Sequence, residues 1–193
     1  MNEMIEYLLI ICWGTFIFVW LIGAIYNYLN VPVKRKKVIP KTAFPLILLL
    51  WLFVRYIPAS YFVLITYENI WLEILGSILL VIFTIFTLWS RIALGKMWSG
   101  NAQIKENHKL RTEGPYSITR HPIYTGMLGM LLGTNLIYGF GYSFIIFIYV
   151  FIIFKIKINS EEKLLLETFG EEYKDFQKRT PQLLFKLNFF KRS

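Results

Sequence analysis

Residues that bind metals or form covalent cross-links are scarce in this 193-residue chain. Its one cysteine, Cys12, lies inside an apolar run, which excludes a disulfide framework and a cysteine metal site within the chain. The two histidines, His108 and His121, are not spaced like a pair of metal ligands. We therefore predict no metal site.

The sequence also lacks the loops with which many soluble enzymes bind nucleotides. It contains no Gly-x-Gly-x-x-Gly segment, no Gly-Lys-Ser or Gly-Lys-Thr loop and no His-Glu-x-x-His motif. Acidic residues are few, because 12 Asp and Glu stand against 21 Lys and Arg, and the formal net charge is +9. The basic residues flank apolar segments and form no aromatic-rich patch, which argues against a nucleic-acid partner.

Apolar segments are abundant. Hydrophobic residues make up 56% of the chain, above the roughly 45–50% of an average soluble protein. At about 1.5 Å per residue, each of five segments is long enough, or nearly so, to cross a bilayer as a helix. These segments are residues 4–28, 43–66, 70–94, 123–138 and 142–158. We predict an all-α, polytopic integral membrane protein with about five transmembrane helices, the last two forming a hairpin around Gly139 and Gly141.

We expect residues 1–193 to form one membrane domain, with three spans in residues 1–94 and a polar loop, the hairpin and a C-terminal helix in residues 95–193. The loops after the first and third spans, the C-terminal tail and the adjoining helix ends hold 20 of the 21 Lys and Arg residues, all but Arg55. The positive-inside rule then predicts an external N-terminus and a cytoplasmic C-terminus. The Lys-, Ile-, Asn- and Phe-rich composition favours a bacterial plasma membrane.

The longest polar interruption is residues 110–126, LRTEGPYSITRHPIYTG. Pro122 suits the first turn of a helix and favours an extended backbone at His121, so a helix is predicted to begin here. Free N–H groups of that first turn would face the cytoplasmic loop, where an anionic group can dock beside Arg120, with Tyr124 one turn further on. Alternatively, Arg120 reaches a lipid phosphate and Tyr124 belongs to the interfacial aromatic belt.

Three glycines, Gly126, Gly129 and Gly133, fall on one face of the predicted fourth span. Small residues at this spacing favour close packing between membrane helices. Direct contact with a ligand is the less favoured interpretation.

Residues 159–178 are predicted to form an amphipathic helix. Glu162 extends the apolar face of this helix by one turn and should point toward the membrane domain, whereas Glu161 is rotated by about 100°. Asn159 and Glu162 also match a capping box, which requires a helix to begin there. The apolar face consists of Leu166, Phe169, Tyr173 and Phe176.

Two blocks of the sequence resemble a known family. The run over residues 108–126, HKL followed by EGPYSITRHPIYTG, is similar to the signature of the isoprenylcysteine carboxyl methyltransferase family, which phospholipid N-methyltransferases share. The later EEKLLLETFGEEYKDFQKRTP resembles the second block of that family, and the likeness covers residues 93–185. It implies an integral membrane methyltransferase that uses S-adenosyl-L-methionine. The acceptor would be a lipophilic or lipidated molecule, methylated at the cytoplasmic face on the oxygen of a carboxylate or enol.

The resemblance also implies roles for individual positions. The residues expected to be catalytic are Arg120, His121 and Glu162. The residues expected to bind the cofactor are His108, Leu110, Tyr116, His121, Pro122, Tyr124, Gly126, Glu161 and Glu162.

Three other interpretations remain open. One is N-methylation of phosphatidylethanolamine, and another is a sterol-reductase-like enzyme using NADPH, because sterol reductases have a similar Arg-His-Pro-x-Tyr element. The third is a membrane scaffold without activity. Membrane lipids are the expected partners in every case.

Overall fold

A computed structural model describes residues 3–30, 33–36, 69–98, 103–105 and 109–184. The predicted second span, residues 43–66, lies outside the described residues, as do Arg55 and His108. The five-span prediction is therefore compared with the structure only over its other four segments.

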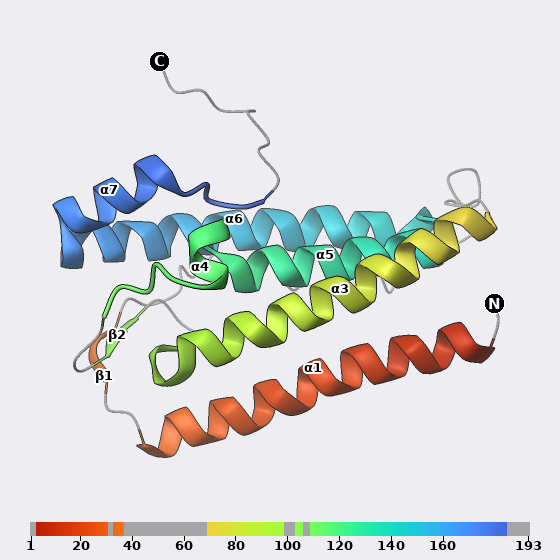
Figure 1. Cartoon of the computed structure of the whole chain (residues 1–193), viewed down its shortest axis with the longest axis horizontal. Helices are drawn as coiled ribbons and strands as arrows, with labels where there is room; N and C mark the ends of the chain where they lie inside the picture. The colour runs from red at the N-terminus through yellow and green to blue at the C-terminus, as the bar shows by residue number, and fades with distance from the viewer. Residues whose placement is uncertain (1–2, 31–32, 37–68, 99–102, 106–108, 185–193) are drawn as a thin grey trace.

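In the described ranges, four long helices run roughly side by side (Figure 1): α1 (Glu3–Asn30), α3 (Ile70–Leu94), α5 (Pro122–Ile137) and α6 (Gly141–Phe169). Within the described residues, α1, α3 and α6 contain segments that are long and apolar enough to cross a membrane. The 16 residues of α5 reach only about 24 Å, less than the roughly 30 Å hydrocarbon core. The predicted hairpin is confirmed, because α5 and α6 are joined by a tight turn in which Gly139 and Phe140 have positive φ angles of 69° and 66°.

Close contact between α3 and α5 positions the polar residues at the start of α5. A Cβ atom on Gly133 would lie 2.7 Å from the carbonyl oxygen of Gly76, and one on Gly126 would lie 2.0 Å from Oγ1 of Thr87. A Cβ atom on Gly129 would meet the ring of Phe83. The interpretation that these glycines allow close helix packing is confirmed, since any larger side chain would push the helices apart.

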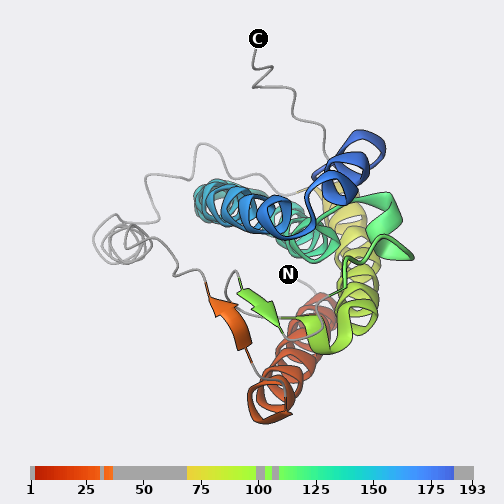
Figure 2. The same cartoon turned by 90° about the vertical axis from the view of Figure 1, so that its left-hand side faces the viewer.

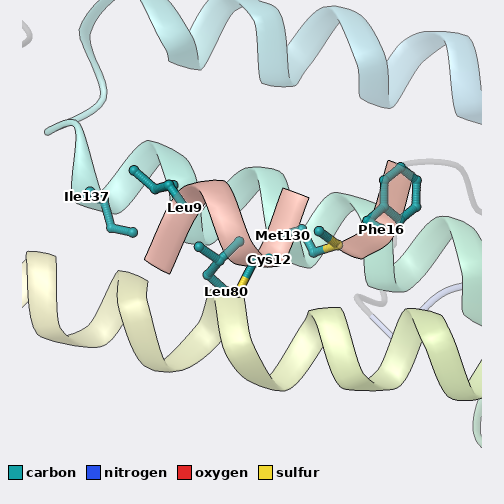
Figure 3. Packing of buried hydrophobic residues seen from close by; sticks show 6 residues of the cluster. All are labelled: Leu9, Cys12, Phe16, Leu80, Met130 and Ile137. Carbon is teal, nitrogen blue, oxygen red and sulfur yellow. The ribbon is translucent and has the colours of Figure 1, made fainter. Parts of the chain in front are cut away.

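An apolar cluster joins α1 to this pair of helices. Figure 3 shows its six buried side chains between α1, α3 and α5. Trp13 of α1 reaches across and donates from Nε1 to Oγ1 of Thr134 at 3.1 Å. The cluster consists of Leu9, Cys12, Phe16, Leu80, Met130 and Ile137.

The short elements gather at one end of the bundle, which we call the polar end (left in Figure 1). They are the 3-10 helix η2 (Gly95–Met97), α4 (Pro115–Ile118), α7 (Glu171–Arg179) and two strands, β1 (Val33–Lys36) and β2 (Gln103–Lys105). The strands pair antiparallel, with Val33 opposite Lys105 and Lys36 opposite Gln103, and Figure 2 shows this ribbon beside the ends of α1 and α3. The prediction of a purely α-helical fold missed this ribbon, because its residues are polar and lack an alternating pattern.

The tail helix differs from its prediction. The alternative in which Asn159 and Glu162 form a capping box is wrong, because α6 continues without interruption to Phe169 and no helix begins at Asn159. The chain breaks instead at Gly170, whose φ of 54° favours glycine, and α7 follows. Tyr173 and Phe176, predicted for the apolar face, are both buried.

Candidate active site

The candidate site lies at the polar end, where the start of α5 meets α6 and α7. Arg120 donates from Nε to Oε1 of Glu162 at 2.8 Å, and its Nη2 lies 2.8 Å from the same oxygen. Its Nη1 donates to the carbonyl oxygens of Gln177 at 3.2 Å and Thr180 at 2.6 Å. One guanidinium thus ties the start of α5 to α6 and to the end of α7.

His121 stands between two carboxylates. Its Nε2 is 3.1 Å from Oε1 of Glu162, and its Nδ1 is 3.8 Å from Oε2 of Glu161. An ionised carboxylate only accepts hydrogen bonds, so Nε2 carries the proton of that short contact. The side chain is only 5% exposed, which leaves the imidazole fixed beside both acids.

Tyr124, one turn into α5, contacts the other acid. Its hydroxyl donates to Oε1 of Glu161 at 2.6 Å. Its ring lies 5.0 Å from that of Phe154 and 5.9 Å from that of His121, measured between centroids. The ammonium of Lys157 lies 5.6 Å from the centroid of the Tyr124 ring. The site therefore combines two acids and three cationic or imidazole groups with an aromatic wall.

The segment after α7 returns along the start of α5 and holds it in place. The backbone N–H of Arg120 donates to the carbonyl oxygen of Pro181 at 2.9 Å. Thr119, which is fully buried, donates from Oγ1 to the carbonyl oxygen of Gln182 at 2.9 Å. The acceptors in both hydrogen bonds are backbone carbonyl oxygens of Pro181 and Gln182. The path of the backbone after α7 therefore holds the start of α5 in position.

Two buried tyrosines border the acids. The Tyr173 hydroxyl on α7 is buried and lies close to the side chains of Glu162 and Arg120. Burial, and then the negative charge of Glu162, raises the pKa of Tyr173 above its usual range. Burial, followed by the charge of Glu161, likewise raises the pKa of Tyr116 in α4. Both phenols therefore stay neutral at physiological pH and can donate hydrogen bonds.

Of the residues named from the sequence, the structure brings together Arg120, His121, Tyr124, Glu161 and Glu162. The other predicted cofactor residues lie differently. Pro122 forms the first turn of α5, and Leu110 is half-buried in the polar loop. Gly126 faces Thr87 in the α3–α5 contact, so its position is explained by helix packing.

The rotation of about 100° that periodicity assigns to Glu161 relative to Glu162 does not carry its side chain away from the start of α5. Both carboxylates reach the start of α5, where Glu162 meets Arg120 and His121 while Glu161 meets Tyr124. Two adjacent helical positions differ by about 100°, but their long side chains converge because the residues they meet are themselves spread over one turn of α5. The apolar stripe alone could not reveal this.

The sequence did not point to three other contributors. Gln177 donates from Nε2 to Oε2 of Glu162 at 3.3 Å, Thr119 binds the returning segment, and Tyr173 lies against Glu162. The sequence offered one signal, the apolar spacing that placed Tyr173 on the inward face of the tail helix. Thr119 and Gln177 act through backbone and amide contacts that no spacing indicates.

Comparison with known proteins gives this site a context. The sequence model of the family described as "Phospholipid methyltransferase" matches residues 71–172. A protein-S-isoprenylcysteine O-methyltransferase B of Arabidopsis thaliana is 31% identical over 117 residues, which cover 59% of this chain and 59% of that protein. The human protein-S-isoprenylcysteine O-methyltransferase is 29% identical over 118 residues, covering 58% of this chain and 40% of that protein. The chain thus spans less than two thirds of the length of these relatives.

A solved structure shares the fold. It is that of a eukaryotic intramembrane Ras methyltransferase, an isoprenylcysteine carboxyl methyltransferase, with a TM-score of 0.59 and 24% sequence identity. The superposition covers 78% of this chain and 55% of that one. Together with the apolar helices, these likenesses identify an integral membrane protein. Because the family model matches more than half of the sequence, the chain belongs to the phospholipid methyltransferase family, within the superfamily that also holds the isoprenylcysteine carboxyl methyltransferases.

Proposed function

We propose that the protein is an S-adenosyl-L-methionine-dependent methyltransferase that methylates the oxygen of a lipophilic carboxylate or enol at the cytoplasmic face of the membrane. The observation that carries this proposal is the convergence of Arg120, His121 and Tyr124 on Glu161 and Glu162. The family to which the chain belongs supports the same reaction class.

The chemistry of the donor set fits this cofactor. S-adenosyl-L-methionine carries a sulfonium and an ammonium, both positive, and a carboxylate. Glu161 is the acid with capacity to spare, because its close partner is the Tyr124 hydroxyl and its side chain is 20% exposed. The neutral Tyr173 hydroxyl offers a further donor beside Glu162. Residues that would hold the cofactor are thus the two glutamates, Tyr124 and Tyr173.

When bound, the cofactor supplies an electrophilic methyl group on a sulfonium. The residues of this chain would align the acceptor oxygen with that group, because in-line displacement depends on near-attack geometry. Arg120 and Glu162 form a rigid part of the site, because four contacts fix the position of the Arg120 guanidinium. Their burial keeps water from competing with the acceptor.

His121 is the candidate for moving a proton. A carboxylate acceptor needs no base, but an enol or phenol has a proton to lose. The short contact to Glu162 places the imidazole proton on Nε2, so Nδ1, facing Glu161, is the atom that could accept one. The proton would then be stabilised by the nearby Glu161 carboxylate.

The location suits two ligands of opposite polarity. The site lies at the polar end of apolar helices, where a polar cofactor could enter from the aqueous side and an oily acceptor from the bilayer. The charge distribution of the sequence favours the cytoplasm for this end.

A second candidate is N-methylation of a phospholipid amine. The match to the phospholipid methyltransferase family favours it, and the same pair of acids would attract an ammonium headgroup. His121 would then take the proton that the amine must lose before attack.

Ligand binding to the detergent-purified full chain tests the proposal. We expect S-adenosylhomocysteine to bind and NADPH not to bind in isothermal titration calorimetry. With radiolabelled S-adenosylmethionine, the label should pass to a lipophilic carboxylic acid, such as an S-farnesyl thiol acid, in preference to phosphatidylethanolamine. Binding of NADPH alone would contradict methyl transfer, and label in the phospholipid alone would establish the second candidate.

A further inference from the structure

A second arginine at the polar end is buried, and no acidic residue in the described ranges pairs with it. Arg91 lies in the last turn of α3 and is 6% exposed. Its Nη1 donates to the carbonyl oxygen of Gly95 at 3.0 Å, and its guanidinium carbon lies 4.6 Å from the centroid of the Trp98 ring. Within the described residues its buried Nε has no hydrogen-bond partner, and no carboxylate forms an ion pair with it. A buried charge in this state has a desolvation cost that an anionic ligand would offset.

Arg91 forms part of the wall of a cavity of about 370 Å³ between α1 and α3. Apolar side chains of both helices, Val19, Ile22 and Ile92, line the same cavity, and Lys96 of η2 lines it as well. Ile22 and Ile92 are also exposed on the outer surface of the apolar helices, at 53% and 73%. The cavity therefore has mainly apolar walls that continue onto the exposed surface of the helices, with the cationic residues Arg91 and Lys96 among its lining.

Gly23 of α1 allows the guanidinium to lie against the neighbouring helix. A Cβ atom at this position would be 2.3 Å from Nη2 of Arg91. Asn27, one turn later, donates from Nδ2 to the carbonyl oxygen of Trp98 at 2.9 Å and fixes the end of α1 beside η2. Residues of α1 as well as α3 therefore determine where the Arg91 guanidinium lies.

We propose that this cavity binds the phosphate headgroup of an acidic membrane phospholipid, with Arg91 as its ionic partner and an acyl chain along Ile22 and Ile92. Basic pockets between membrane helices on the cytoplasmic side bind anionic headgroups in this way. A free inorganic anion would gain nothing from the apolar walls, and a zwitterionic lipid would bring a cation that competes with Arg91. The cavity shares no lining residue with the Arg120–Glu162 site.

Lipid titrations of the detergent-purified full chain test this inference, with the melting temperature and native mass spectrometry as readouts. Phosphatidylglycerol should raise the melting temperature by mass action and remain bound in the spectrometer, whereas phosphatidylcholine and inorganic phosphate should do neither. Arg91→Gln should weaken the affinity for phosphatidylglycerol by roughly 10- to 150-fold, as expected for losing hydrogen bonds to a charged group. Lys174→Gln, which removes an exposed cation of α7, is the matched control and should respond like the unmodified protein.

Two further variants keep the test informative if Arg91→Gln does not fold. Gly23→Ala places a methyl group against the guanidinium and should weaken phosphatidylglycerol binding severalfold, while Gly14→Ala, whose added Cβ would meet nothing within 4 Å, should not. An unchanged affinity in Arg91→Gln or Gly23→Ala would overturn the inference. Equal responses to phosphatidylcholine or to inorganic phosphate would overturn it as well, by showing a general lipid site or a free-anion site.

Discussion

Arg120 and Arg91 lie at the same end of the molecule and are almost equally buried, but the contacts of their guanidinium groups differ. Arg120 contacts Glu162 through two nitrogens and two backbone carbonyl oxygens through the third. Arg91 has one carbonyl oxygen and one aromatic ring. The first guanidinium is satisfied by the chain itself, whereas no acid within the described part of the chain compensates the charge of the second, which lies beside a cavity.

By this difference, the charge of Arg120 has a structural role, whereas the charge of Arg91 is available to a ligand. A buried ion pair holds its partners in one arrangement, because separating them leaves a charge in a poorly solvated place. At the candidate site, Arg120 thereby fixes Glu162, and Glu161 remains the more accessible acid. At the cavity no acid of the described residues opposes Arg91, and the proposed lipid phosphate would supply the opposite charge.

The largest expected effect concerns the stability of the two arginine variants. Arg120→Gln should lower the free energy of unfolding by about 3–5 kcal/mol, because it leaves Glu162 buried without its cation. Arg91→Gln should change it by less than about 1 kcal/mol, since losing an unpaired charge offsets the lost contacts. Thermal unfolding of the lipid-free protein in detergent measures both. A similar fall in melting temperature for the two variants would contradict the comparison.

A smaller effect separates the two acids. Glu162→Gln should reduce both the melting temperature and the affinity for S-adenosylhomocysteine, because Glu162 is committed to Arg120 and His121. Glu161→Gln should leave the melting temperature nearly unchanged and still weaken binding, since its close partner is the Tyr124 hydroxyl. Calorimetric titration beside thermal unfolding distinguishes these outcomes. Loss of stability in Glu161→Gln alone would mean that the roles of the acids are exchanged.

The sequence predicted the long helices because their signals are local. Apolar runs located the long helices that the structure describes, and the glycines on the Gly126 face predicted close helix packing, whose partner the structure identifies as α3. The polar segment starting at Arg120 and the Glu161–Glu162 pair could be named as one site only through the family resemblance, since 40 residues of chain separate them. Periodicity placed Glu162 at the site correctly.

What the sequence could not supply depends on long-range geometry. The continuation of α6 past Asn159 depends on packing that overrides a good capping sequence. The convergence of Glu161 on Tyr124 depends on how one turn of α5 faces α6. Arg91 gave no signal as a site residue, because an arginine at the end of an apolar run is typical of a helix end at the membrane surface. Arg91 is set apart by having no acidic partner among the residues that the structure describes.

The proposed cofactor site consists of the start of α5 and the paired acids of α6. Two tyrosine-to-phenylalanine variants test this assignment most directly. Tyr124→Phe removes only the hydroxyl that donates to Glu161, while Tyr138→Phe removes an exposed hydroxyl at the other end of the same helix. Isothermal titration calorimetry should show S-adenosylhomocysteine binding weakened by roughly 5- to 150-fold in Tyr124→Phe, the cost of one buried hydrogen bond, and unchanged in Tyr138→Phe. Unchanged affinity in a Tyr124→Phe protein with the melting temperature of the unmodified chain would contradict the claim.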